Sequence, residues 1–118
     1  MSEKSGLDLI NEAKEKIREI SARDAVAHQE PGVVYYDCRE PNEYALGHIP
    51  GAVFIPRGNL ETKIEAVIPR NAKVLIYCAT GNRSALAAVT MREMGYNDVA
   101  SMSGGFRGWV EAGGAVES

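Results

Sequence analysis

The sequence is short of the residues from which metal sites and disulfide frameworks are built. It contains only two cysteines, Cys38 and Cys78, and two histidines, dispersed along 118 residues. Structural zinc usually takes four clustered ligands, so we expect no metal and no other cofactor. Each cysteine ends an apolar run that is typical of a strand, and a reducing compartment would keep both as thiols.

Long apolar runs and an excess of positive charge are also lacking. No run approaches the ~20 apolar residues of a membrane span, and the first six residues have no apolar core of the kind a signal peptide needs. We therefore expect a cytoplasmic protein with no membrane partner. The net charge of −3 does not provide the basic surface that phosphate neutralisation requires, so we expect no nucleic-acid partner either.

What is present fits one ordinary globular domain. The chain is 45% hydrophobic and 25% charged. Leu7, Ile10, Ala13 and Ile17 fall at helical spacing, which predicts an amphipathic helix in segment 1–17. We expect segment 18–114 to form the domain proper and 115–118 to be a tail.

Strand and helix patterns alternate along segment 18–114. Apolar runs predict strands at 33–37, 53–55, 74–77 and 99–102, with a short extended segment at Ile20; the run 33–37 has the pattern of a strand buried on both faces. Helical patterns lie between them, at 22–28, 41–44, 60–67, 84–94 and 104–110. This alternation predicts an α/β fold, with a mainly parallel sheet of about five strands and helices on both faces.

Cys78 occupies the position where such a sheet binds ligands, the carboxyl end of a strand. The next residues, Ala79 to Arg83, are small or polar and lead into a helix, so their N–H groups can form an anion-binding nest. That environment, with the Arg83 cation, would lower a thiol pKa from ~8.5. We interpret Cys78 as a nucleophile; the alternative is a buried strand-end cysteine.

The spacing of Cys78 and Arg83 bears on the reaction. Cysteine phosphatases hold phosphate in a Cys-x5-Arg loop, whereas this loop is Cys-x4-Arg. A loop one residue shorter makes a narrower cradle, which suits one sulfur atom better than a tetrahedral phosphate. A phosphatase or arsenate reductase remains an alternative that the spacing disfavours.

Four segments resemble the signatures of the rhodanese family of sulfurtransferases. They are the DCREPNEY and GHIPGA segments at 37–44 and 47–52, the six-residue loop 78–83, and SGGFRGW at 103–109. The resemblance runs from about residue 20 to residue 113, and the helix in segment 1–17 is extra.

The resemblance implies sulfur transfer in two steps. Cys78 would attack a small anionic donor such as thiosulfate, hold the outer sulfur as a persulfide and pass it to a thiol or to cyanide. The substrate-binding residues would be those of the loop, through their N–H groups and through the side chains of Arg83 and Thr80: Ala79, Thr80, Gly81, Asn82 and Arg83.

A second class of function fits the same residues. Rhodanese-like domains also serve as sulfur carriers and as protein-interaction modules, and the extra helix could dock to a protein sulfur acceptor or to a second copy of the chain. The sequence specifies neither the donor nor the acceptor.

The polar residues near Cys78 each allow a structural interpretation. Asp37 at a strand end and His48 in a tight turn are expected to satisfy local backbone, rather than to serve as a contact of the active loop and a general base. Arg39 and Glu43 lie four residues apart, a spacing that suits an ion pair. Cys38 is interpreted as a buried bystander, with a resolving thiol as the alternative.

Overall fold

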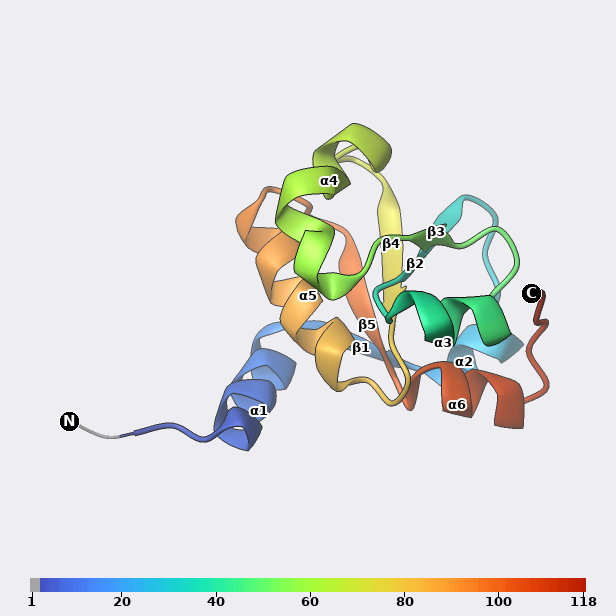
Figure 1. Ribbon diagram of the computed structural model, residues 1–118, viewed down its shortest axis with the longest axis horizontal. Coiled ribbons are helices and arrows are strands. Elements are labelled where there is room, and N and C mark those ends of the chain that lie inside the picture. The colour runs from blue at the N-terminus through green and yellow to red at the C-terminus, as the bar shows by residue number, and fades with distance from the viewer. Residues whose placement is uncertain (1–2) are drawn as a thin grey trace.

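A five-stranded, all-parallel sheet forms the centre of the protein in the computed structural model, which describes residues 3–118 (Figure 1). Met1 and Ser2, the start of the expected segment 1–17, lie outside these residues. The strand order is β1-β5-β4-β2-β3. The strands are β1 (Arg18–Ser21), β2 (Val33–Asp37), β3 (Val53–Phe54), β4 (Lys73–Tyr77) and β5 (Val99–Ser103). The predicted α/β fold is confirmed.

Helices follow the strands where the sequence pattern predicts them, with shifts at some ends. The helix predicted at 41–44 continues to Leu46, and the one predicted from residue 84 begins at Asn82. A short 3₁₀ turn, η1 (Arg57–Asn59), was not predicted. The α-helices are α1 (Gly6–Lys16), α2 (Ala22–Ala27), α3 (Pro41–Leu46), α4 (Leu60–Val67), α5 (Asn82–Glu93) and α6 (Gly105–Glu111).

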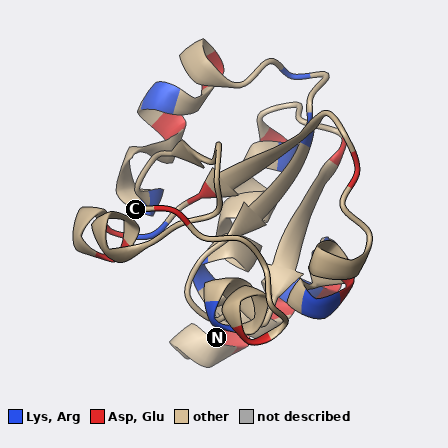
Figure 2. Ribbon diagram, turned by 90° about the vertical axis from the view of Figure 1, so that its right-hand side faces the viewer, with Lys and Arg blue, Asp and Glu red and all other residues tan. Residues whose placement is uncertain are grey.

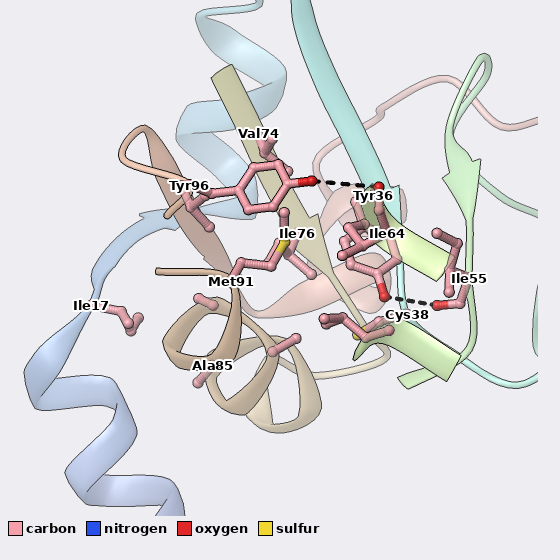
Figure 3. Close-up of a cluster of buried hydrophobic side chains, with 14 of the residues drawn as sticks. Ile17, Tyr36, Cys38, Ile55, Ile64, Val74, Ile76, Ala85, Met91 and Tyr96 are labelled. Carbon is pink, nitrogen blue, oxygen red and sulfur yellow. Dashed lines mark hydrogen bonds between the residues drawn. The ribbon is translucent and has the colours of Figure 1, made fainter. Parts of the chain in front are cut away.

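Each face of the sheet has its own buried cluster, because side chains alternate along a strand. On one face Tyr36 and Ile76 pack against α4 and α5, together with Ile17 at the end of α1 (Figure 3). On the other face Tyr77 packs with residues of α2 and with Trp109 of α6. The helices thus cover both faces, as predicted.

The burial predicted for β2 is complete only at its carboxyl end. Only Tyr36 and Asp37 are fully buried, whereas Val33 to Tyr35 are half-buried. Val33 and Tyr35 line a hollow beside α2, and Val34 packs against the cluster on the other face.

Helix α1 packs against α5 and is capped at its start. The Ser5 hydroxyl accepts a hydrogen bond from the Asp8 N–H at 3.0 Å, while Ala13 is buried. Among residues 3–118, no helix combines the length and the apolar character that a membrane crossing needs. Charged residues of both signs lie mainly on the helices and loops, and the central strands are largely free of them (Figure 2).

Candidate active site

The loop from Cys78 to Arg83 joins the carboxyl end of β4 to the start of α5. Gly81 makes the turn possible because its φ of 108° lies in a region that side chains rarely adopt. A Cβ at this position would also lie 3.2 Å from the Met102 carbonyl oxygen of β5. The turn brings Cys78, which is 1% exposed, beneath the loop.

Hydrogen-bond donors of the loop and of α5 surround the Cys78 sulfur. The Gly81 N–H lies 3.1 Å from Sγ and the Ser84 N–H lies 3.4 Å from it. The Ser84 hydroxyl is 3.5 Å from the sulfur and 2.7 Å from the hydroxyl of Ser101 on β5. With a thiolate at Cys78, Ser101 can donate to Ser84 and Ser84 to the sulfur, so both hydroxyls are satisfied in the buried site.

Cys38 lies next to Cys78, just beyond the end of the neighbouring strand. It follows Asp37, which pairs with Tyr77 in the β2–β4 register, and its own N–H donates to the Tyr77 carbonyl oxygen at 3.1 Å. Cys38 and Cys78 therefore occupy matching positions and belong to the same buried cluster.

These contacts make the two cysteines unlike. The pKa of Cys78 is lowered to about 4, first by the hydrogen bond from the Cys38 thiol and then, against the effect of burial, by the donors of Ser84 and Gly81. The pKa of Cys38 is raised by the same hydrogen bond and by burial. Cys78 is accordingly a thiolate at neutral pH beside a neutral Cys38 thiol.

Helix α6 fixes the loop from the other side. The Phe106 N–H donates to the Cys78 carbonyl oxygen at 2.8 Å and the Arg107 N–H to that of Ala79 at 3.2 Å. The approach requires glycine at position 105, where φ is 57° and a Cβ would lie 2.5 Å from the Ala79 carbonyl oxygen. The SGGFRGW segment thus positions the loop through its backbone.

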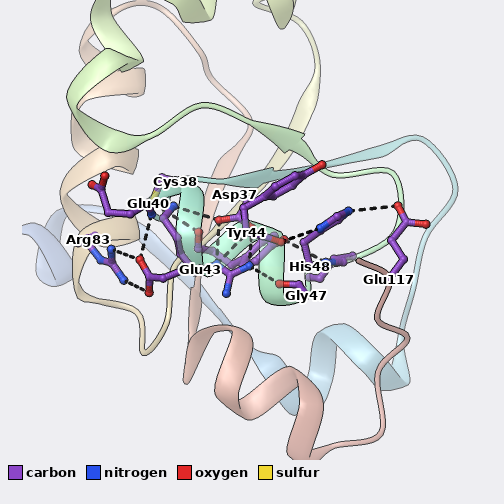
Figure 4. Close-up of polar contacts among 12 residues, drawn as sticks. Asp37, Cys38, Glu40, Glu43, Tyr44, Gly47, His48, Arg83 and Glu117 are labelled. Atoms are coloured by element: carbon purple, nitrogen blue, oxygen red, sulfur yellow. Dashed lines mark hydrogen bonds and ion pairs between the residues drawn. The ribbon is translucent and has the colours of Figure 1, made fainter.

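Arg83 does not point freely into the site. Its two terminal nitrogens bind the two carboxylate oxygens of Glu43 at 2.8 and 3.0 Å, an ion pair between α5 and α3 (Figure 4). This pair is the first cause of the lowered pKa of Glu43, about 2. Cys38, Ser84 and Gly81 are the main causes of the lowered pKa of Cys78, and the Arg83 cation acts on the thiolate through its charge.

The predicted ion pair between Arg39 and Glu43 does not form. Arg39 precedes α3 and binds Asp37 instead, with its Nη2 2.7 Å from one carboxylate oxygen and 2.7 Å from the Gly47 carbonyl oxygen. The i, i+4 spacing therefore does not apply, because Arg39 lies outside the helix. Asp37 has the structural role expected of it, since Arg39 occupies both of its oxygens.

His48 lies at the opposite end of α3 from Arg83 (Figure 4). Its ring stacks on Tyr44 with centroids 3.8 Å apart, and its Nδ1 is 3.1 Å from the Tyr44 carbonyl oxygen. The backbone groups of His48 and Glu117 exchange two hydrogen bonds, so this turn anchors the end of the chain. These contacts agree with a structural role.

The remaining predicted site residues form the rim of the loop. Thr80 and Asn82 are exposed and Ala79 is half-buried. Sequence reasoning missed Ser84 and Ser101 and undervalued Cys38. A usable signal was present for Ser84, which follows Arg83 in the first turn of α5, where a polar side chain faces the preceding strand end.

Comparison with known proteins decides the family. Residues 21–112 match the model of the rhodanese-like domain. The chain belongs to the rhodanese-like family. Helix α1 lies outside the matched part of this rhodanese-like domain.

Its relatives include enzymes and carriers of sulfur. The thiosulfate sulfurtransferase GlpE of Pseudomonas fluorescens is 36% identical over 94 residues, which are 80% of this chain and 85% of that protein. The putative sulfur carrier protein YrkF of Bacillus subtilis is 40% identical over 74 residues, 63% of this chain but only 40% of that longer protein.

Among solved structures, a protein of unknown function from Rhodopseudomonas palustris, described as a possible tyrosine phosphatase, is similar over nearly its whole length. The TM-score is 0.87 and the identity 36%, with 99% of this rhodanese-like domain protein and 97% of that chain covered. The similarity therefore includes α1.

Proposed function

We propose that the protein is a sulfurtransferase that takes a sulfane sulfur from thiosulfate or a similar anionic donor and carries it as a persulfide on Cys78. The observation that supports this most is the set of donors around the Cys78 sulfur, which hold a thiolate at neutral pH. A thiolate is the form of cysteine that attacks a sulfane sulfur.

The proposed reaction has two half-reactions. The Cys78 thiolate attacks the outer sulfur of thiosulfate, the sulfur–sulfur bond of the donor breaks, and sulfite leaves with the bond electrons. The acceptor, cyanide or a thiolate, then attacks the outer sulfur of the persulfide and restores the Cys78 thiolate. N–H groups of the loop from Ala79 to Arg83 stabilise the persulfide anion.

Arg83 binds the anionic part of the donor in this proposal. An arginine has five N–H donors, and the ion pair with Glu43 engages only part of them. The guanidinium remains about one-third exposed, so it can contact a sulfonate while Glu43 holds it in place. Exposed Thr80 is the second candidate contact at the rim.

The geometry favours sulfur over phosphate as the transferred group. Only four residues separate Cys78 from Arg83, and Cys78 is 1% exposed under a loop that α6 fixes from behind. A single sulfur atom needs less room beside that sulfur than a phosphate with three cradled oxygens.

Intact-mass spectrometry after exposure to thiosulfate tests the proposal. The wild type should gain one sulfur, about 32 Da, that cyanide removes, and Cys78→Ser should gain none. A wild type that neither gains this mass nor releases sulfite would exclude thiosulfate as the donor. Phosphate release from an aryl phosphate by the wild type, lost in Cys78→Ser, would support the phosphatase alternative.

A sulfur carrier remains the second candidate, because the matched relative YrkF is a putative carrier. Steady-state turnover of thiosulfate with cyanide separates the two. Repeated turnover supports an enzyme, whereas a single loaded equivalent that leaves only to a protein acceptor supports a carrier.

A further inference from the structure

Cys38 lies where a second cysteine can reach the Cys78 sulfur directly. The pairs Tyr36–Ile76 and Asp37–Tyr77 set the β2–β4 register, and the Cys38 N–H continues the ladder by one bond to the Tyr77 carbonyl oxygen. Cys38 is thus opposite Cys78. Opposed residues on adjacent parallel strands point to the same face, and both cysteines belong to the cluster beneath α5.

This placement is compatible with a covalent bond between the sulfurs. Paired residues on adjacent strands lie about 4.8 Å apart, within the range of Cα separations that disulfides span. Cys38 approaches from the neighbouring strand, whereas the Gly81 and Ser84 donors approach from the loop and α5. Cys78 therefore has a second cysteine beside it, at the end of the neighbouring strand.

The Cys38 thiol has a backbone acceptor. It donates to the Tyr77 carbonyl oxygen at 3.4 Å, and the neighbouring Cys78 and burial raise its pKa. Cys38 is 0% exposed, and Figure 3 shows it within the apolar cluster. Thiols from solution therefore do not reach Cys38, and Cys78 is the cysteine that lies beside it. It is held as a protonated thiol until its neighbour changes.

We propose that Cys38 is a resolving thiol that discharges the Cys78 persulfide as sulfide. This inference rests on the proposed function, because it starts from the persulfide. The Cys38 sulfur attacks the inner sulfur, Sγ of Cys78, and a Cys38–Cys78 disulfide forms. The bond from that Sγ to the outer sulfur breaks, and the outer sulfur leaves as HS⁻ with the Cys38 proton.

The electrons balance within the protein. Two cysteine sulfurs are oxidised to the disulfide, and the sulfane sulfur is reduced to sulfide. A dithiol, or two molecules of a small thiol, then reduces the disulfide and restores both cysteines. Thiosulfate and a dithiol would thus be converted to sulfite, sulfide and a disulfide, which adds a sulfide-releasing activity to sulfur transfer.

A single turnover without free thiols tests this step. The reduced wild type, freed of reductant and kept anaerobic, is mixed with thiosulfate, and intact mass, sulfite and sulfide are followed with time. The adduct of about 32 Da should convert to a species about 2 Da lighter than the starting protein, with about one equivalent of sulfide. Cys38→Ser, which can still hydrogen bond to the Tyr77 carbonyl oxygen, should form the adduct and keep it.

The outcomes separate the inference from the proposed function. If the wild type keeps the adduct as long as Cys38→Ser does and releases no sulfide, Cys38 is not a resolving thiol, and sulfur transfer through Cys78 stands. If neither protein gains about 32 Da or releases sulfite, the proposed function fails and the inference with it. Cys38→Ala, with a smaller side chain, should behave as Cys38→Ser does; prompt sulfide release from either variant overturns the inference.

Discussion

The neighbouring strands β2 and β4 are each succeeded by a buried cysteine, but the surroundings of the two cysteines differ. After β4, the loop and α5 direct N–H and hydroxyl groups at Cys78. After β2, side chains bind one another and the backbone, as in the Asp37–Arg39 pair, and Cys38 faces the carbonyl oxygen of Tyr77. Donors favour a thiolate and an acceptor favours a thiol, so the same residue type takes opposite protonation states a few ångströms apart.

The largest effect on the β4 side is expected for Gly105→Ala, which disturbs the contact of α6 with the loop. Alanine at position 105 must adopt a φ of 57°, and its Cβ would lie 2.5 Å from the Ala79 carbonyl oxygen. We expect the free energy of unfolding to fall by about 3 kcal/mol. Urea denaturation measures this, with Gly32→Ala as the control.

Gly32 shares the positive φ, 83°, but has open space around it, so Gly32→Ala should cost only about 1 kcal/mol. Equal losses in the two variants would show that the contact of α6 with the loop is not what requires glycine at 105.

The connection between the two regions is tested by Arg83→Ala. Without Arg83, the Glu43 carboxylate is left unpaired beside the loop and repels an anionic donor. We expect kcat/KM for thiosulfate to fall about 10- to 100-fold. The double variant Arg83→Ala/Glu43→Ala should recover part of the loss; no recovery would mean that repulsion by Glu43 is not the cause.

The protonation of Cys78 is tested by Ser84→Ala. With a pKa of about 4, wild-type Cys78 should be alkylated at a rate that is nearly constant from pH 8 to pH 6 and reaches half its plateau near pH 4. Loss of the Ser84 donor should raise this midpoint by about one pH unit.

Ser101→Ala removes a hydroxyl that is hydrogen-bonded to that of Ser84, and it should shift the midpoint less. An unchanged midpoint in Ser84→Ala would show that the hydroxyl does not stabilise the thiolate.

The smallest effect is expected on the β2 side, for His48→Gln. The variant loses the stack on Tyr44 and weakens the turn, so the free energy of unfolding should fall by about 1 kcal/mol. Sulfur transfer from thiosulfate should be unaffected in kcat and KM. A tenfold fall in kcat would instead support a general base at this position.

Sequence reasoning identified the elements of this fold because each has a local cause. The apolar runs at β2 and β4 and the glycines that frame α5 and α6 lie within a few residues of what they determine. Cys78 was identifiable for the same reason, since a strand end, a small-residue loop and a helix start are consecutive.

Contacts between strands were harder to predict. Cys38 and Cys78 meet because β2 and β4 are neighbours in one particular register, and alternation alone leaves that register open. Ser101 reaches the site only through Ser84, from a third strand. Glu43 pairs with Arg83, forty residues away on α5, a contact that spacing along the chain does not reveal.

The bonds from α6 to the loop carbonyls have a consequence for the polarity of the site. A trans peptide plane carries its C=O and N–H on opposite edges. Once Phe106 and Arg107 hold the carbonyl oxygens of Cys78 and Ala79, the N–H groups of the same two planes must turn the other way. A helix more than twenty residues later in the chain thus sets the direction of the Ala79 and Thr80 N–H groups at the start of the loop.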